Sequence, residues 1–314
     1  MDTSRTLISV VIPCYNQGRF LEEAVRSAAS TASRIEVIIV DDGSQDDTAA
    51  VAARCAPARY VRQENRGLAA ARNRGLAEAT GDLVVFLDAD DRLLPGGIDE
   101  GARALAAHPA CAMAYGRCVM MGADGAVLPT PQQRRVLSGH YAVLLRTNPI
   151  WSPGMAIFRR AALVDAGGFS HGFDAAADYD LYLRVARAHP VHDHGALVAA
   201  YRRHDAAMSA SAQRMLRDTL AVMARHRPAD GDAAHLAAWR EGYAAWQDFY
   251  GTQLTEEIRA HVRARAVDAA LAKTYALARY APRILRREAG RKLRRLLAGT
   301  RGAAKLRAEA PDLK

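Results

Sequence analysis

Residues 83–91 read Leu-Val-Val-Phe-Leu-Asp-Ala-Asp-Asp, an apolar run followed at once by three carboxylates within four residues. The run is short and rich in Val, so it predicts a buried strand that ends at Leu87. Asp88, Asp90 and Asp91 would repel one another strongly unless a cation or a proton neutralised them. Carboxylate oxygens suit a hard divalent cation, Mg²⁺ or Mn²⁺, which also bridges diphosphate oxygens. The alternative is a solvated acidic turn that caps the next helix.

The same pattern of a short apolar run and a helical stretch recurs toward the N-terminus. The predicted strands are Leu7–Ile12, Glu36–Val40, Ala58–Val61 and Leu83–Leu87, and the predicted helices are Phe20–Ala32, Asp47–Ala56, Leu68–Ala79 and Ile98–Ala107. Repeated strand–helix–strand units form right-handed parallel crossovers. The sequence therefore predicts an α/β protein with a doubly wound, mostly parallel sheet, whose ligands bind beyond the carboxyl ends of the strands.

Three of these strands end in aromatic or acidic residues. The first is followed by Pro13-Cys14-Tyr15-Asn16, the second by Asp41-Asp42-Gly43-Ser44 and the fourth by residues 88–91. Neither G-x-x-x-x-G-K-[ST] nor G-x-G-x-x-G occurs, so no glycine-rich loop of those kinds holds phosphate. A nucleotidyltransferase that makes activated sugars needs a glycine- and lysine-rich loop after the first strand. It is disfavoured because residues 13–18 contain neither Lys nor Arg.

The later part of the chain has a different pattern. The expected strands are Ala112–Met121, Ala126–Leu128, Met155–Phe158 and Ala196–Tyr201, and the expected helices are Arg160–Ala166 and Tyr179–Ala188. Beyond Ser209 the patterning is helical to about Ala298, with breaks at Pro228 and near Pro282. We predict an α/β domain over residues 1–209 and a C-terminal α-helical extension over residues 210–314.

Composition places the chain among soluble globular proteins, because 50% of residues are apolar and 25% are charged. We find no apolar run of 18 residues, so no transmembrane helix is expected, and the N-terminal residues make a poor signal peptide. The four cysteines (Cys14, Cys55, Cys111 and Cys118) form no C-x-x-C pair. This usage fits a reducing cytoplasm.

The net charge of +9 is concentrated near the C-terminus. Residues 283–307 hold ten basic residues and one acid, so the rest of the chain is neutral. A neutral body with a basic end indicates a docking element, and no nucleic acid partner is expected. On a helix, Leu285, Ala289, Leu293, Leu296 and Leu297 gather on one side, flanked by Arg286, Arg287, Arg291, Arg294 and Arg295. We expect this segment to bind an anionic membrane surface. The alternative is that its leucines pack on the protein.

The order and spacing of these motifs resemble family-two glycosyltransferases of the GT-A fold. The resemblance runs almost continuously from Leu7 to Pro95 and more weakly to about Ser209. Its later pieces are Asn65-Arg66-Gly67, Ala71-Arg72-Asn73, Gly167-Gly168-Phe169 and the helix that begins near Asp178. The final hundred residues show no resemblance to this family pattern.

The resemblance implies a nucleotide-sugar donor, with UDP-sugar favoured, and a divalent metal, Mn²⁺ or Mg²⁺. Donor binding falls to Pro13, Tyr15, Asp41, Asp42, Asn65, Gly67, Arg72, Asp88, Asp90 and Arg202. Metal binding falls to Asp90, Asp91 and His204. Tyr15 would offer its ring to the base, and Asp42 would accept a hydrogen bond from the pyrimidine. The metal would offset charge on the leaving diphosphate.

An inverting transfer also requires a base to deprotonate the acceptor hydroxyl. The resemblance gives this role to Asp178, with Asp180 as the second candidate, although both residues are also good helix N-terminal caps. Many relatives have Glu-Asp where this chain has Ala177-Asp178. Trp151 lies where the acceptor should approach. A zinc site at His192 and His194 is disfavoured because no cysteine lies nearby.

Together these features predict a cytoplasmic, metal-dependent, inverting glycosyltransferase, peripheral at the inner face of the cell membrane. It would move a sugar from a nucleotide-sugar to the hydroxyl of a glycan or lipid-linked acceptor in cell-surface glycan biosynthesis. The main alternative is a non-catalytic protein of the same fold that binds nucleotide-sugars or acts as a scaffold. The complete acidic set favours the enzyme.

Overall fold

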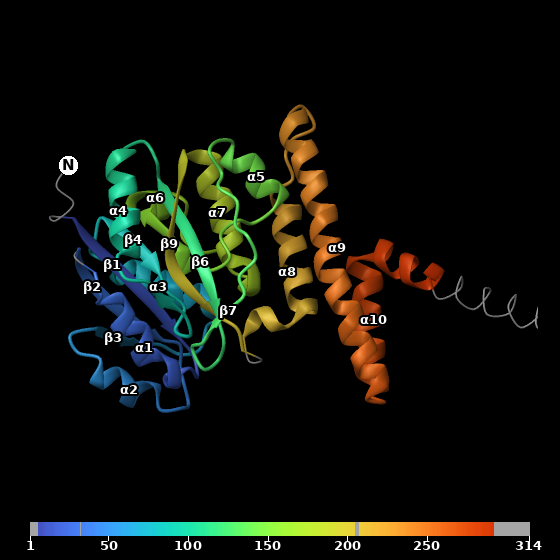
Figure 1. The fold of residues 1–314 in the computed structure, drawn as a ribbon, viewed down its shortest axis with the longest axis horizontal. Helices are drawn as coiled ribbons and strands as arrows, with labels where there is room; N and C mark the ends of the chain where they lie inside the picture. Colours follow the sequence, from blue (N-terminus) through green and yellow to red (C-terminus); the bar gives the residue numbers. More distant parts are fainter. Residues whose placement is uncertain (1–5, 32, 205–206, 292–314) are drawn as a thin grey trace, which may run out of the picture.

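The computed structural model describes residues 6–31, 33–204 and 207–291. Its centre is one 9-stranded sheet with the order β3-β2-β1-β4-β8-β6-β9-β5, and β7 pairs with β6 (Figure 1). The strands are β1 (Leu7–Cys14), β2 (Arg34–Asp41), β3 (Arg59–Arg62), β4 (Leu83–Phe86), β5 (Arg92–Leu93), β6 (Met113–Met121), β7 (Val127–Leu128), β8 (Ala156–Arg159) and β9 (Val191–Arg202). The helices of the α/β part are α1 (Gly18–Ala28), α2 (Thr48–Arg54), α3 (Leu68–Glu78), α4 (Gly97–Ala107), α5 (His140–Arg146), α6 (Arg160–Asp165) and α7 (Ala177–Ala188).

The first four long strands pair in parallel, as the sequence predicts. β1 pairs with β2 and with β4, and β2 pairs with β3. The other half of the sheet is mixed, because β8 runs antiparallel to both β4 and β6, while β6 and β9 are parallel. The prediction of a mostly parallel sheet therefore holds for one half only. The carboxyl ends of β1, β2 and β4 still meet at one edge.

Helices cover both faces of the sheet because the inner strands are apolar on both sides. Ile8, Val10 and Ile12 of β1 pack toward α1, α2 and α4, whereas Val11 belongs to the core beneath α3, α6 and α7. Gly75 of α3 makes close packing possible here, since a Cβ on it would come within 2.1 Å of Val11 Cγ1. The strand–helix units thus hold the loops at the carboxyl edge on a rigid base.

Two short elements, α5 and β5, have no counterpart in the sequence-based assignment. Helix α5 has seven residues and begins after Gly139, which has a φ of +64°. Strand β5 has two residues and pairs with β9. Both are too short to show a periodic pattern, so packing against neighbours defines them. Strand β9 also begins earlier than predicted, at Val191, because its first residues pair with β6.

The C-terminal extension is a layer of helices beside α5 and α7 (Figure 1). It consists of α8 (Ala212–Arg225), α9 (Ala233–Arg263), α10 (Val267–Tyr280) and a helix over residues 282–291. Gly242 of α9 lies against α5 so closely that a Cβ would come within 1.9 Å of the Leu145 carbonyl oxygen. None of the helices in the described part of the chain is long and apolar enough to cross a bilayer.

The start of the predicted membrane-binding segment packs on the extension. Ile284 is buried with α9 and α10, and Leu285 packs against the same cluster. Arg287 donates to Thr252 Oγ1 at 3.3 Å, and Arg291 pairs with Glu288 at 2.8 Å. The other predicted residues further along, Leu293, Leu296, Leu297, Arg294 and Arg295, lie outside the described residues.

Candidate active site

The loop after β2 is built around Asp42, which is almost fully buried. Its Oδ1 accepts hydrogen bonds from Gln63 Nε2 at 2.7 Å and from the Arg66 amide at 2.9 Å. Its Oδ2 accepts from the Gly67 amide at 2.8 Å. One carboxylate thus fixes the loop from β3 to α3, which includes the exposed Asn65. Asp42 is predicted to contact the donor base, and in the structure it also anchors the neighbouring loop.

Asp41 is fully buried and supports the same turn. Its Oδ1 accepts from the Ser44 amide at 2.7 Å, and its Oδ2 accepts from the Tyr60 hydroxyl at 2.5 Å. Gly43 between them has a φ of +78°, and a Cβ there would come within 2.9 Å of the Asn65 amide nitrogen. Only glycine fits this position without moving the 63–67 loop.

The loop after β1 presents an aromatic ring to solvent. Pro13 is buried at the end of the strand, while the Tyr15 side chain is exposed to 45%. Asn16 has a φ of +53°, and its Oδ1 accepts from the Gln45 amide at 2.8 Å. This bond ties the loop after β1 to the loop after β2. Tyr15 is therefore an open ring at the rim of a braced loop, which suits stacking on a base.

Asp88 forms an ion pair with Arg72 of α3. Arg72 Nη2 lies 2.6 Å from Asp88 Oδ1, and the guanidinium also lies over the ring of Phe169, 5.1 Å from its centroid. Arg72 is buried, whereas the Asp88 carboxylate is partly exposed. The charges of Asp88 and Asp178 both favour the protonated guanidinium and help to raise the pKa of Arg72 against the effect of burial. The buried cation thus holds one carboxylate at the open edge.

Asp90 faces His204, with 2.8 Å between Asp90 Oδ2 and His204 Nε2. Gln17 Nε2 donates to the same oxygen at 3.3 Å. Burial, together with the charge of Asp88, raises the pKa of Asp90 above its ordinary value. A bound cation beside Asp90 would offset the cost of keeping this carboxylate charged next to Asp88.

The Asp90–His204 pair fits a divalent cation. Asp90 Oδ2 and His204 Nε2, an oxygen and an imidazole donor that lie together, would both hold such an ion. The His204 Nδ1 atom is buried without a hydrogen-bond partner. Residues 6–31, 33–204 and 207–291 contain no cluster of three or more His, Cys, Asp or Glu that could hold a metal. Such an ion would therefore need further ligands from phosphate oxygens and water, as Mg²⁺ commonly does.

Asp91 is placed differently from the sequence-based assignment as a metal ligand. It is buried, its Oδ2 accepts from Ser152 Oγ at 2.5 Å, and its Oδ1 accepts from the Arg202 amide at 2.8 Å. Both oxygens are thus used inside the protein. Asp91 anchors the end of β9 beside the acidic loop, and we correct its assignment from ligand to positioning residue.

Arg202, which the sequence assigns to donor binding, is also placed differently. Its side chain is 2% exposed, and it lies over the Phe20 ring, 4.6 Å from the centroid. Its Nε donates to the Asp90 carbonyl at 2.6 Å, its Nη1 donates to two carbonyls of the 122–123 turn, and its Nη2 pairs with Glu23 Oε2 at 2.5 Å. Every guanidinium nitrogen has a protein partner. Arg202 therefore holds the acidic loop in place and has no nitrogen free for a diphosphate.

Asp178 lies in the first turn of α7, partly exposed, beside the Arg72–Asp88 pair. Its Oδ1 accepts a hydrogen bond from the Tyr179 amide at 2.8 Å. Burial raises its pKa to about 6, although the charge of Arg72 opposes the rise. A carboxylate with a pKa near neutrality is suited to take a proton at physiological pH.

Asp180, the second candidate base, lies in a different environment. It is fully buried and bonds His226 Nε2 at 2.9 Å and Arg184 Nε at 2.9 Å. Burial alone would raise its pKa, but the His226 hydrogen bond and the Arg184 charge outweigh it and lower the pKa to about 2. Asp180 thus joins α7 to the end of α8. A fully buried, ion-paired carboxylate has no access to an acceptor, so we correct its assignment as a base.

The structure also brings residues to this edge that the sequence motifs did not single out. Arg203 is exposed next to the buried Arg202. Burial raises the pKa values of Tyr201 and Tyr250, and the Arg203 charge opposes that rise. The two-residue alternation along β9 is a signal that distinguishes Arg203 from Arg202. Tyr250 comes from α9, and no local pattern predicts that the charge of Asp178 acts on it.

Trp151, predicted to lie where the acceptor approaches, is half-buried and packs against the core.

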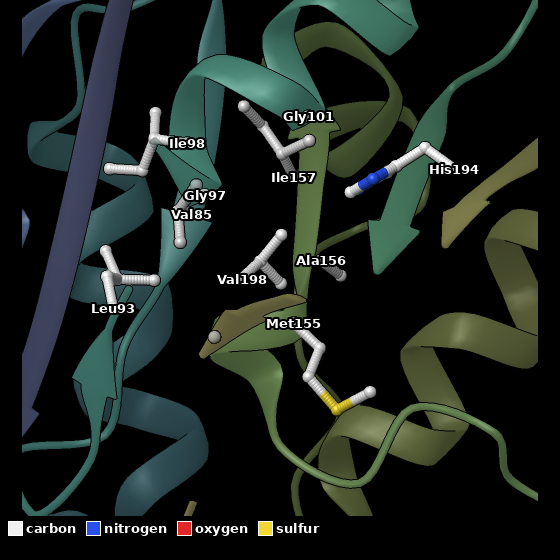
Figure 2. A pocket seen from close by; sticks show the side chains of 11 residues that line it. Val85, Leu93, Gly97, Ile98, Gly101, Met155, Ala156, Ile157, His194 and Val198 are labelled. Carbon is white, nitrogen blue, oxygen red and sulfur yellow. The ribbon is translucent and has the colours of Figure 1, made fainter. Parts of the chain in front are cut away.

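Within the described residues, His192 and His194 of the histidine-rich segment 189–194 form no hydrogen bond, ion pair or ring contact with Asp88, Asp90 or Asp178. His194 lines a cavity of about 10 Å³ between α4 and β8, with Val85, Ile98 and Ile157 around it (Figure 2). Burial lowers the pKa of His194 to about 4, so its imidazole is neutral at pH 7. His192 stacks on His108, with 3.9 Å between ring centroids. The cavity has room for about one water molecule. These contacts agree with packing roles for both imidazoles.

Comparison with known proteins identifies the family. The sequence model of glycosyl transferase family 2 matches residues 9–167, which is half of the chain. The chain belongs to this family. An uncharacterized protein of Mycobacterium tuberculosis is 32% identical over 203 residues, which cover 59% of this chain and 63% of that protein. An uncharacterized glycosyltransferase of Nostoc sp. is 35% identical, over 50% of this chain and 52% of that protein.

A third relative is the O-antigen biosynthesis protein RfbC of Myxococcus xanthus. It is 31% identical over 59% of this chain, but the match covers 15% of the relative. The chain thus spans less than two-thirds of the length of each of these relatives.

Two solved structures share the fold at low sequence identity. TarS 1–349 of S. aureus in complex with UDP-GlcNAc aligns with a TM-score of 0.58 and 17% identity, over 86% of this chain and 90% of that chain. A mannosyltransferase of Pyrobaculum calidifontis in complex with GDP-Man and Mn²⁺ also has a TM-score of 0.58, with 22% identity, over 88% and 82%. This likeness confirms the predicted GT-A type fold with a C-terminal helical region.

Proposed function

We propose that the protein is an inverting glycosyltransferase that uses a nucleotide-sugar donor, with Asp178 as the general base. One observation supports this most directly. Asp178, with its pKa raised to about 6, lies beside the Arg72–Asp88 ion pair. Asp88 is two residues before Asp90, which faces His204. The proposed base would therefore lie next to the edge proposed to bind the diphosphate. A glycosyl transfer needs this pairing, because attack and departure occur on opposite sides of one carbon.

Asp178 would act on the acceptor hydroxyl. As the oxygen attacks the anomeric carbon in line, its proton passes to the Asp178 carboxylate, a new C–O bond forms, and the bond to the diphosphate oxygen breaks. The configuration at the anomeric carbon inverts because attack comes from the face opposite the leaving group. Arg72 limits the rise in the Asp178 pKa, so that the carboxylate is largely unprotonated at pH 7.

Asp90 and His204 would hold a divalent cation, Mn²⁺ or Mg²⁺, which when bound neutralises charge on the departing diphosphate. Asp91 and Arg202 position these two residues through the bonds described above. Arg203 is exposed and precedes His204 in the chain, and its guanidinium is suited to pair with phosphate oxygens. The Mn²⁺ in the mannosyltransferase structure supports this proposal without fixing the metal for this chain.

The donor site would lie between Tyr15 and the Asp42-anchored loop. Tyr15 has an open ring for stacking, and Asp42 holds the backbone that the base would approach. Structural neighbours bind UDP, UDP-GlcNAc and GDP-Man, and a UDP-sugar is the donor class we propose. The RfbC relative supports a role in cell-surface glycan biosynthesis, with a glycan or lipid-linked acceptor.

A screen of UDP- and GDP-sugars for thermal stabilisation, with and without Mn²⁺, tests donor binding. A ligand that binds only the folded protein raises Tm by mass action. We expect at least one nucleotide-sugar to do so, and more strongly with Mn²⁺. Stabilisation without any turnover would favour the non-catalytic alternative. No stabilisation by any nucleotide-sugar would contradict the proposal.

We also propose that the basic segment 283–307 binds the inner face of the cell membrane and places the enzyme near lipid-linked acceptors. Ten basic residues against one acid support this, at about 1 kcal/mol for each basic residue near an anionic surface. Ile284 and Leu285 pack on the extension, so the membrane contact would come from residues further along. Co-sedimentation with anionic and neutral vesicles, using the full chain and a chain ending at Pro282, tests it. Equal binding by both would contradict it.

A further inference from the structure

Helix α9 brings an aromatic cluster to the neighbourhood of Asp178. The Trp246 and Tyr250 rings stack, with centroids 5.5 Å apart and an interplanar angle of 13°. Phe249 meets Tyr250 edge-on at 4.9 Å and Trp246 at 6.1 Å. The three side chains come from the C-terminal extension, beyond the part of the chain that the family model matches.

Direct contacts connect this cluster to the start of α7. Trp246 Nε1 donates a hydrogen bond to the Tyr179 hydroxyl at 3.3 Å, and their rings lie 5.9 Å apart. Tyr179 immediately follows Asp178. Burial raises the pKa of the Tyr250 hydroxyl most, and the charges of Tyr201 and Asp178 raise it further. The cluster therefore packs against the first turn of α7, where the proposed base Asp178 lies.

The cluster is open to solvent at Phe249. Its side chain is 55% exposed, whereas Trp246 and Tyr250 are partly buried behind it. A single exposed aromatic residue would need no explanation. This one, however, continues a buried aromatic stack that ends beside a candidate catalytic carboxylate, with the exposed Arg203 nearby. An apolar ring with polar and charged neighbours provides an amphipathic surface.

We propose that Phe249, supported by Trp246 and Tyr250, forms an acceptor subsite that binds a pyranose ring of a glycan. The inference rests on the proposed function. The C–H face of a pyranose is apolar and packs on an aromatic ring, while its hydroxyls bind polar groups at the edge. Arg203 and the Tyr250 hydroxyl supply such groups, which a lipid chain would leave unpaired. The C-terminal extension would then contribute directly to acceptor choice.

Saturation-transfer NMR with simple methyl glycosides tests this subsite. Methyl β-D-glucopyranoside, methyl α-D-mannopyranoside and the methyl β-glycoside of N-acetylglucosamine serve as probes with the full chain. We expect wild-type protein to bind at least one of them, and Phe249→Ala to weaken that binding by about fivefold, the size of an aromatic contact. Tyr275→Ala is the matched control, because Tyr275 is 70% exposed on α10. It should bind the glycoside as the wild type does.

Phe249→Leu separates a ring-stacking site from a general apolar one. It should weaken glycoside binding as Phe249→Ala does, since leucine has no flat face. Full binding by Phe249→Leu would overturn the inference and favour a lipid chain as the occupant. Unchanged binding by Phe249→Ala, or no binding of any probe by the wild type, would also overturn it.

Donor hydrolysis by the wild type reports separately on the proposed function. Glycoside binding that depends on Phe249, without hydrolysis of any nucleotide-sugar, would contradict the proposed function and leave the subsite standing. Hydrolysis with Phe249-independent glycoside binding would contradict the subsite alone.

Discussion

Arg72 Nη2 lies 2.6 Å from Asp88 Oδ1, and the same guanidinium charge opposes the rise that burial causes in the pKa of the neighbouring Asp178. One buried arginine thus acts on two carboxylates that the sequence separates by 90 residues. It holds Asp88 at the diphosphate edge and limits how far burial raises the pKa of the proposed base. The proposed donor and acceptor sides of the site would be coupled through this one side chain.

The first prediction concerns the pH dependence of turnover. Asp178 must be unprotonated to accept a proton, and burial raises its pKa to about 6. We expect kcat to rise about tenfold for each pH unit below this value and to level off above it. Arg72→Met removes the opposing charge and should shift the midpoint upward. A wild-type profile that is flat between pH 5 and 8 would count against Asp178 as the base.

A second prediction concerns the stability of Asp178→Asn. Because the folded-state pKa of Asp178 lies above its unfolded value, the charged form destabilises the fold at high pH, and this effect fades as pH falls through 6 toward 4. Asp178→Asn should therefore raise the free energy of unfolding by about 1–3 kcal/mol at pH 8 and by little at pH 4. Denaturant unfolding at the two pH values measures this. A variant less stable than wild type at pH 8 would show that the carboxylate is a structural cap.

Arg202 and Arg203 should respond in opposite ways to substitution. Arg202→Met removes the ion pair with Glu23 Oε2 and the donor to three loop carbonyls, so we expect a loss of about 2–4 kcal/mol in stability. Arg203→Ala should leave Tm unchanged and weaken nucleotide-sugar binding by about tenfold. Thermal unfolding and calorimetric titration with the donor separate the two effects. Equal loss of donor affinity without destabilisation in Arg202→Met would restore its assignment to the diphosphate.

Asp42→Ala should affect both stability and donor binding. Three hydrogen bonds from Gln63, Arg66 and Gly67 end on this carboxylate, so its removal frees the 63–67 loop and costs about 2–3 kcal/mol. The donor should bind more weakly, because the loop borders its base. Hydrogen exchange at residues 63–67 measures the loop directly. Lost donor affinity with unchanged exchange would mean that Asp42 contacts the base and does little for the loop.

The sequence predicted the parallel half of the sheet because β1, β2, β3 and β4 each appear as a short apolar run followed by a helical pattern. It did not predict α5 or β5, which are too short for periodicity and are formed by contacts with distant segments. The residues at the carboxyl edge were also predictable, since the ends of parallel strands meet there. Asp42 and Asp88 were identified in this way, whereas Asp178, in the first turn of α7, was identified by the resemblance to the family.

The sequence could not assign roles within that edge. Asp91 and Asp90 are neighbours in one acidic run, yet Asp91 is bonded internally and Asp90 faces His204. The same applies to Asp178 and Asp180, which differ because His226 comes from the end of α8 to pair with Asp180. Such differences depend on partners far along the chain, so local motifs carry no signal for them.

Release of nucleoside diphosphate from nucleotide-sugars in the presence of Mn²⁺ is the most direct test of the account. Wild-type protein, Asp178→Asn and Asp90→Ala should be compared with and without excess chelator, with donor affinity measured in parallel. We predict turnover by the wild type that chelator abolishes and Mn²⁺ or Mg²⁺ restores. Asp178→Asn should bind donor normally but turn over about 10²–10⁴-fold more slowly. Wild-type turnover by Asp178→Asn, or full activity in excess chelator, would contradict it.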